Sequence, residues 1–121
     1  MTRIIAVDDS PSMRKMVGMT LASAGYEVLS ACDGCEALEL AKSTEGVDLV
    51  ITDVNMPNMD GITLVRELRQ IPRYRGVPLL VLTTEASTAK KMEGKAAGAT
   101  GWVVKPFSPE RLLATIAKIV A

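Results

Sequence analysis

The sequence predicts an α/β fold in which a five-stranded parallel sheet is covered by helices on both faces. Three observations support this prediction. The chain has 121 residues, which is the length of one domain. Its residues are 48% hydrophobic but only 3% aromatic, so the core is expected to be aliphatic, as is typical of parallel sheets. Short aliphatic runs also alternate with segments of helical periodicity along the whole chain.

Each predicted strand is a short aliphatic run, as expected for strands that are buried on both faces. The runs are Ile4–Val7, Val28–Ala31, Leu49–Thr52, Leu79–Thr83 and Gly101–Val104. The first helix follows the first run, with Ser10 as its N-cap, Pro11 at its first position and Gly25 just past its end. Its predicted apolar face consists of Met13, Met16, Val17, Thr20 and Leu21.

Four more helices are predicted from the remaining segments. Three of them lie between the strands, near Cys35–Ser43, Gly61–Gln70 and Ser87–Ala97. The last helix repeats the start signal of the first, with Ser108 before Pro109. Its apolar face consists of Leu112, Leu113, Ile116, Ile119 and Val120. Strands that alternate with helices imply right-handed crossovers, and the flavodoxin-like strand order 2-1-3-4-5 fits this pattern.

The composition excludes several classes of function. The formal net charge is zero, so no basic surplus draws the chain to nucleic acid or to anionic lipid. Histidine is absent, which excludes a Ser-His or Cys-His catalytic pair and a histidine-ligated metal. The apolar runs are too short to cross a bilayer, and Asp8 and Asp9 interrupt any signal peptide. We therefore expect a cytoplasmic protein without a nucleic-acid or membrane partner.

Polar side chains stand at the ends of four predicted strands. Asp8 and Asp9 end the first strand, Asp53 the third, Thr83 the fourth and Lys105 the fifth. Ligands of such a sheet bind outside the carboxyl ends of its strands, so three carboxylates are expected to converge there. Carboxylates that close repel one another unless a cation joins them, and oxygen-only ligands favour Mg²⁺. A carboxylate, a metal, a lysine and a hydroxyl are together the parts needed for phosphoryl transfer to an aspartate.

Each of these residues has a simpler explanation when it is taken alone. Asp8 and Asp9 precede a helix and favour its N-terminal dipole, and Asp53 fits a turn. Thr83 suits a strand, and Lys105 suits a solvated surface. It is their combination at four strand ends, in the right order, that favours the functional interpretation.

At these residues the sequence resembles the receiver domains of bacterial two-component systems, from Ile4 to Val120. The matching blocks are Val7–Ser10, Ala31–Leu38, Asp53–Gly61, Thr83–Ala86 and Lys105–Phe107. The resemblance implies that Asp53 accepts a phosphoryl group and that Lys105 pairs with this group, with a cis Lys105–Pro106 bond. It further implies an Mg²⁺ ion bound at Asp53, directly by Asp9, mainly through water by Asp8, and by the backbone carbonyl of Asn55.

The resemblance also implies how such a switch works. Thr83 moves toward the phosphoryl oxygen, and an aromatic residue on the last strand swings inward into the space that it leaves. Trp102 occupies that place, where Tyr or Phe is commoner; the alternative is a Trp that only packs against the fourth helix. Glu85 and Asn55 stand where family members tune the lifetime of the acyl phosphate, and the pair is most similar to chemotaxis receivers of the CheY type.

The resemblance thus implies a stand-alone monomeric receiver over residues 1–121, without an output domain. Its expected partners are a histidine kinase as phosphodonor, a target such as a flagellar motor switch component, and a phosphatase. The alternatives are a receiver in a non-chemotaxis phosphorelay and a phosphorylation-independent interaction domain. A turnover enzyme is not expected, because aspartate-nucleophile hydrolases place a general acid where this chain has Asn55. The acidic loop after the first strand also argues against a nucleotide or flavin site.

Two further motifs are interpreted as incidental to this function. Cys32 and Cys35 have the spacing of a redox dithiol, but they fall at freely varying places of the family's Ala-x-Asp-Gly-x-Glu-Ala-Leu block, which favours a structural role. Lys90, Lys91 and Lys95 form a basic cluster on the fourth helix, and such clusters are usually solvated faces. Because the family's partner surface includes this helix, binding of acidic partners is the alternative.

Overall fold

A five-stranded parallel sheet lies at the centre of the structure, a computed structural model that describes residues 1–120. The strands are β1 (Arg3–Val7), β2 (Glu27–Ala31), β3 (Leu49–Thr52), β4 (Leu79–Thr83) and β5 (Gly101–Val104). The helices are α1 (Pro11–Ser23), α2 (Gly34–Ser43), α3 (Gly61–Leu68), α4 (Thr88–Ala97) and α5 (Pro109–Val120). The strand order is β2-β1-β3-β4-β5, so the predicted flavodoxin-like topology is confirmed.

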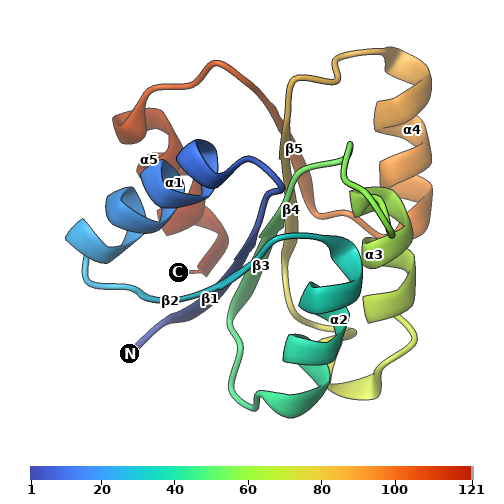
Figure 1. Cartoon of the computed structure of the whole chain (residues 1–121), viewed down its shortest axis with the longest axis horizontal. Helices are drawn as coiled ribbons and strands as arrows, with labels where there is room; N and C mark the ends of the chain where they lie inside the picture. Colours follow the sequence, from blue (N-terminus) through green and yellow to red (C-terminus); the bar gives the residue numbers. More distant parts are fainter. Residues whose placement is uncertain (121) are drawn as a thin grey trace.

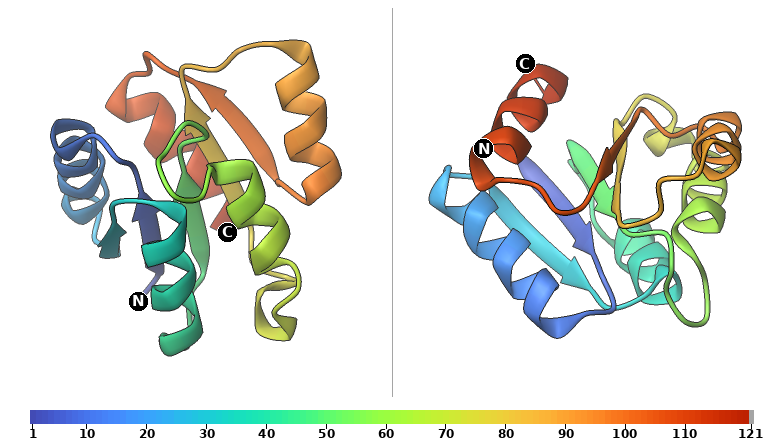
Figure 2. Two further views of the ribbon diagram at one scale, coloured as in Figure 1. Left: turned by 45° about the vertical axis from the view of Figure 1, so that its right-hand side comes forward. Right: turned by 90° about the horizontal axis from the view of Figure 1, so that it is seen from above.

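Helices cover both faces of the sheet. Helices α1 and α5 lie on one face, while α2, α3 and α4 lie on the other (Figure 1), and the view from above shows the same layers (Figure 2). Each face therefore has its own aliphatic core. One core packs Ile5 and Val50 of the sheet against α2 and α3, and the other packs Ile4 and Ile51 against α1 and α5. No helix among residues 1–120 has the length and apolarity that a membrane crossing requires.

The start and stop signals predicted for α1 are confirmed. Ser10 caps α1 by accepting a hydrogen bond from the Met13 amide, and Pro11 is the first helical residue. Gly25 follows the end of α1 with a φ of +88°, a conformation that glycine adopts without steric cost. Helix α3 ends at Leu68 rather than at Gln70, and a short 3-10 helix at Pro72–Tyr74, which the sequence pattern does not predict, follows it.

Two expectations about burial are wrong. The runs at β2 and β5 are predicted to be buried strands, but they are the two edges of the sheet and most of their residues are only partly buried. Met16 is expected on the apolar face of α1, yet it is 40% exposed, because Val17 and Leu21 already fill the space above the sheet. An aliphatic run by itself does not distinguish an edge strand from a central one.

Candidate functional site

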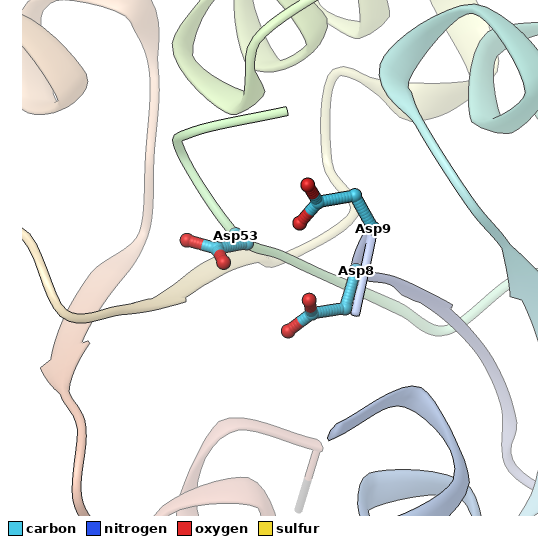
Figure 3. Close-up of side chains that lie close together, drawn as sticks. All are labelled: Asp8, Asp9 and Asp53. Carbon is cyan, nitrogen blue, oxygen red and sulfur yellow. The ribbon is translucent and has the colours of Figure 1, made fainter. Parts of the chain in front are cut away.

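Three carboxylates meet at the carboxyl ends of the adjacent interior strands β1 and β3. These strands are paired with Val7 opposite Thr52, so the residues that follow them, Asp8 and Asp53, leave the sheet side by side. One carboxylate oxygen from each of Asp8, Asp9 and Asp53 lies within 4.8 Å of the others. Figure 3 shows the three carboxyl groups gathered beyond the strand ends. The predicted convergence of the three aspartates is therefore observed.

Lys105 directly follows the edge strand β5 and brings a positive charge into this cluster. Its Nζ donates to Asp8 Oδ2 at 2.8 Å and to Asp53 Oδ2 at 3.2 Å, and its side chain is only 8% exposed. Burial disfavours the ammonium form, but the hydrogen bond to Asp8 and the two carboxylate charges outweigh burial and raise the pKa of Lys105. The Lys105–Pro106 peptide bond is cis, as expected.

Backbone contacts fix the direction of the acidic side chains. The Asp53 amide donates to the Val7 carbonyl, which continues the pairing of β1 and β3 by one residue. Asp53 Oδ1 in turn accepts a short hydrogen bond of 2.6 Å from the Val54 amide. Asp8 Oδ1 accepts from the Ser10 amide, so its second oxygen is the one that faces Lys105. The cluster is thus held by the strand ends and does not depend on flexible side chains alone.

Thr83 and Trp102 both contact the backbone of Glu85, in the loop between β4 and α4. Thr83 is fully buried, and its hydroxyl oxygen accepts a hydrogen bond of 3.2 Å from the Glu85 amide. The Trp102 indole donates from Nε1 to the Glu85 carbonyl at 2.9 Å. The indole is partly buried and lies against Gly94 of α4. Asn55 is exposed in the loop after β3, and its side chain makes no hydrogen bond with the described residues.

The donor set of the cluster fits a hard divalent cation. All candidate ligands are oxygen atoms, and three carboxylates beside one ammonium leave two formal negative charges uncompensated. Asp9 is exposed and Asp53 is partly exposed, so an ion can approach them from solvent, whereas Asp8 is buried beside Lys105. Like charges at this separation repel, and a bound cation would remove the repulsion.

Residues 4–117 match the response regulator receiver domain. The chain belongs to this family. Chemotaxis protein CheY1 of Helicobacter pylori is 39% identical over 111 residues, which cover 91% of this chain and 90% of that protein.

Solved structures of receiver proteins match the fold of this chain. Chemotaxis protein CheY4 of Vibrio cholerae matches with a TM-score of 0.94 and 53% identity over 98% of both chains. The receiver domain of the sensor histidine kinase PA1611 from Pseudomonas aeruginosa PAO1, crystallised with a magnesium ion in its active-site cleft, matches with a TM-score of 0.91 and 28% identity. That match covers 98% of this chain and 97% of the kinase receiver. The chain is therefore a CheY-like receiver domain, which is a signalling fold.

Several residues of the receiver site are not singled out by the sequence. Arg14 of α1 donates to the Asp8 carbonyl at 2.8 Å and so ties the first turn of α1 to the acidic cluster. Gly61 approaches Asp53 so closely that an added Cβ would lie 1.8 Å from the Asp53 carbonyl oxygen. Asp33 accepts a hydrogen bond from Asn58, which lies in the loop after β3. An arginine and an asparagine give no local signal for these contacts, because each one joins separate elements of the fold.

Cys32 precedes the N-cap of α2 and Cys35 lies in its first turn, and both are free thiols. The Cys32 thiol donates to Glu36 Oε2 at 3.3 Å, and this hydrogen bond, with burial and the Glu36 charge, raises the pKa of Cys32. A reactive redox cysteine needs the opposite shift, toward the thiolate. For Cys32 these contacts agree with the structural role that the sequence favours, and that role stays a prediction for both cysteines.

Proposed function

We propose that the chain is a phosphorylation-activated signalling switch in which Asp53 accepts a phosphoryl group from a phosphohistidine of a partner histidine kinase. The main support is the meeting of three carboxylates with the Lys105 ammonium at one edge of the sheet. A carboxylate nucleophile beside fixed positive charge is the arrangement that phosphoryl transfer requires.

The transfer step balances without a further reactant. A carboxylate oxygen of Asp53 forms a bond to phosphorus while the phosphorus–nitrogen bond of the phosphohistidine breaks, and the imidazole leaves with the bonding electron pair. Lys105 already contacts the Asp53 carboxylate and offsets the charge of the incoming phosphoryl oxygens. The product is an acyl phosphate, which carries about one to two negative charges where the carboxylate carried one, so the acidic cluster gains at most about one negative charge.

Mg²⁺ is the proposed cofactor of this step. Asp9 and Asp53 would bind it directly and Asp8 mainly through water, with the backbone carbonyl of Asn55 as a further ligand. When bound, the ion supplies positive charge at the transferring phosphoryl oxygens. The oxygen-only donor set and its two uncompensated negative charges support this assignment. The magnesium ion in the related PA1611 receiver supports it independently.

The proposed conformational change is transmitted from Asp53 to the surface through Glu85. A phosphoryl oxygen on Asp53 would attract the Thr83 hydroxyl, which now accepts from the Glu85 amide. Because Trp102 donates to the carbonyl of that same residue, a shift of Glu85 changes the position of the indole. The phosphoryl group thereby biases an equilibrium between two arrangements of the loop and the indole.

We infer that the output is protein binding in chemotaxis, with a flagellar motor switch component as target and a phosphatase as a further partner. The similarity to CheY proteins of two bacteria supports this assignment. Residues 1–121 would act as one monomeric, cytoplasmic receiver unit. Turnover of free phosphate esters is not part of the proposal, because the Asn55 amide is unable to donate a proton as a general acid.

The first experiment is intact mass spectrometry after incubation with acetyl phosphate and Mg²⁺, in the wild type and in Asp53→Asn. We expect a gain of one phosphoryl mass that depends on Mg²⁺ and is absent in the variant. An adduct that persists in Asp53→Asn would refute the acceptor assignment. Absence of any adduct, together with Trp102 fluorescence that does not respond to a fluoroberyllate mimic, would favour a phosphorylation-independent interaction domain.

The metal assignment has its own test in Asp9→Ala. This exposed aspartate is not needed for the Lys105 contacts, so the variant is expected to fold and to lose the dependence of phosphorylation on Mg²⁺. The control is Asp48→Ala, which removes an exposed carboxylate at the opposite end of the sheet. If Asp9→Ala still required Mg²⁺ at the wild-type concentration, the metal ligands would have to be reassigned.

A further inference from the structure

The loop between β3 and α3 begins after the proposed phosphoacceptor Asp53, and its tip contacts the start of α2. Its base is closed by a hydrogen bond of 2.8 Å from the Gly61 amide to the Val54 carbonyl. Between these two residues lies Asn55, whose carbonyl is proposed as a magnesium ligand. A closed base alone leaves the tip of such a loop free to adopt several conformations, so something else must hold the tip.

The tip is held by a buried carboxylate at the start of α2. Asn58 Nδ2 donates to Asp33 Oδ2 at 2.7 Å, while the other oxygen of Asp33 accepts from the Glu36 amide at 2.8 Å as the N-cap of α2. Asp33 is only 9% exposed. The amide of Glu36 and the Asn58 side chain both lower the pKa of Asp33, so the carboxylate stays charged and the contact is a charge-assisted hydrogen bond.

Two more features show that this contact is built into the backbone. Asn58 has a φ of +69°, a left-handed conformation that asparagine tolerates better than most residues. The neighbouring Gly34 amide donates to the Met59 carbonyl at 3.2 Å, and a Cβ on Gly34 would lie 2.5 Å from that oxygen. The start of α2 and the tip of the loop therefore touch through side chain and backbone at once.

We propose that Asp33 and Asn58 are positioning residues of the receiver site, which hold the Asn55 carbonyl in the place where it binds the metal ion. The inference rests on the proposed magnesium site. Neither side chain is proposed to contact the ion; each acts through the short stretch of loop that joins Asn58 to Asn55. Contacts of this supporting kind change metal affinity by about 10–100-fold when they are removed.

The test is a binding titration with Mn²⁺, which favours the same oxygen ligands as Mg²⁺ and is detected directly by the paramagnetic resonance of the free ion. Asn58→Asp places two carboxylates against each other and should break the contact. The double variant Asp33→Asn with Asn58→Asp exchanges donor and acceptor across the contact and should restore it, since asparagine is also a good N-cap. Asn58→Gly keeps the positive φ while it removes the hydrogen bond.

The expected change in Mn²⁺ affinity is opposite to the one that the added charge alone would cause. Asn58→Asp adds a negative charge near the metal site, which by itself would tighten cation binding. We expect instead about tenfold weaker Mn²⁺ binding in Asn58→Asp and in Asn58→Gly, at the lower end of the range for such contacts. The exchanged pair should return to within about threefold of the wild type. Circular dichroism at the titration temperature verifies that every variant is folded.

The outcomes separate this inference from the proposed function. Wild-type affinity in both Asn58→Asp and Asn58→Gly would overturn the positioning role while leaving the magnesium site in place. A double variant as weak as Asn58→Asp would also overturn it, because the contact and not the residue identity is proposed to matter. A wild type that binds neither Mn²⁺ nor Mg²⁺ would overturn the magnesium site itself, and the positioning role with it.

Discussion

Two regions of the molecule are held in place very differently. One is the acidic edge, which is the cluster of Asp8, Asp9, Asp53 and Lys105 at the carboxyl ends of the strands, and the other is the face formed by α4 and β5. At the acidic edge, β1 and β3 are central strands whose aliphatic residues are all but completely buried, and Lys105 bonds two carboxylates directly. On the other side, β5 is an edge strand with every residue partly buried, and most of α4 is exposed. The difference is compatible with the proposed function, in which the tightly held cluster accepts the phosphoryl group and the less buried face changes its conformation.

The largest expected effect is at the acidic edge, in Gly61→Ala. The new Cβ would lie 1.8 Å from the Asp53 carbonyl oxygen, and a backbone atom is unable to move aside without distorting the strand end. We expect a loss of at least about 3 kcal/mol in the free energy of unfolding, measured by urea denaturation.

Gly18→Ala in α1 is the matched control for that variant. A Cβ added at Gly18 would meet nothing within 4 Å, and the residue lies inside a helix, so alanine should stabilise by about 0.5–1 kcal/mol. If Gly61→Ala were as stable as the wild type, the acidic edge would be more adaptable than its contacts indicate, and the comparison would fail.

Arg69 tests whether the α4 face is anchored at one end. Its guanidinium donates twice to the carbonyl of Gly98, the residue that caps α4, and once each to the carbonyls of Tyr74 and Val77 at 2.6 and 2.7 Å. Arg69→Met would leave the carbonyls of Gly98 and Val77 without these donors, and the Tyr74 carbonyl would keep only the Val77 amide, so we expect a cost of about 2–3 kcal/mol.

The position of that loss is as informative as its size. Hydrogen exchange should accelerate at Gly98 and in the last turn of α4, while amides of β1 and β3 keep their relative protection. The control is Arg66→Met, which removes an exposed arginine of α3. An equal acceleration in the central strands would show that the two regions unfold as one unit.

Lys105→Met tests the electrostatics of the acidic edge. The variant leaves the buried Asp8 carboxylate without its cation, so we expect a loss of about 2 kcal/mol at neutral pH in the absence of divalent ions. Added Mg²⁺ should stabilise the variant more than the wild type, because the site then holds three carboxylates and no fixed positive charge. Equal stabilisation of the two proteins by Mg²⁺ would argue against an ion in this cluster.

The pH dependence of stability gives an independent test of the contacts that Lys105 makes with Asp8 and Asp53. Folding raises the pKa of Lys105 above its ordinary value of 10.5, so the ammonium contributes stability that is fully present below pH 10.5. This contribution is lost as the pH rises through the higher folded value. The wild type should therefore lose part of its free energy of unfolding above pH 10.5, and Lys105→Met should lack this loss. Urea titrations of both proteins at several pH values measure the difference.

The contrast between the two regions also explains what the sequence could predict. The acidic cluster was predictable because parallel strands end at a common edge, so Asp8, Asp53 and Lys105 had to meet once the strand order was known. The central strands were predictable for the same reason, since burial on both faces leaves an uninterrupted aliphatic run. The partial burial of β2 and β5 was missed, although the predicted strand order already places both strands at the edges of the sheet, because an aliphatic run looks the same in an edge strand and in an interior one.

Contacts between distant segments were beyond the sequence pattern. Asn58 bonds a carboxylate 25 residues away, and no local periodicity announces such a pair. The 3-10 helix at Pro72–Tyr74 is too short to show a period, although its buried Tyr74 hydroxyl donates to the Ala41 carbonyl and so joins it to α2.

The smallest expected effect is on the α4 face, where a missing side chain makes room for an aromatic one. A Cβ on Gly94 would lie 2.6 Å from Cζ3 and 3.1 Å from Cε3 of Trp102, so the six-membered part of the indole occupies the space above this glycine. A glycine inside a helix normally costs about 1 kcal/mol relative to alanine. We infer that this cost is offset here by the fit of the large ring against α4.

Gly94→Ala should therefore lower the free energy of unfolding by about 1 kcal/mol, because the overpacking cost of about 1–3 kcal/mol exceeds the gain in helix propensity. The Trp102 emission maximum should shift as the indole leaves its place. In a Trp102→Phe background the same substitution should become stabilising, since phenylalanine lacks the outer ring that meets the new Cβ. Were Gly94→Ala to stabilise the protein in both backgrounds, as Gly18→Ala is expected to do, the indole would be free of α4. The fit of the large ring against Gly94 would then contribute nothing to the packing of the α4 face.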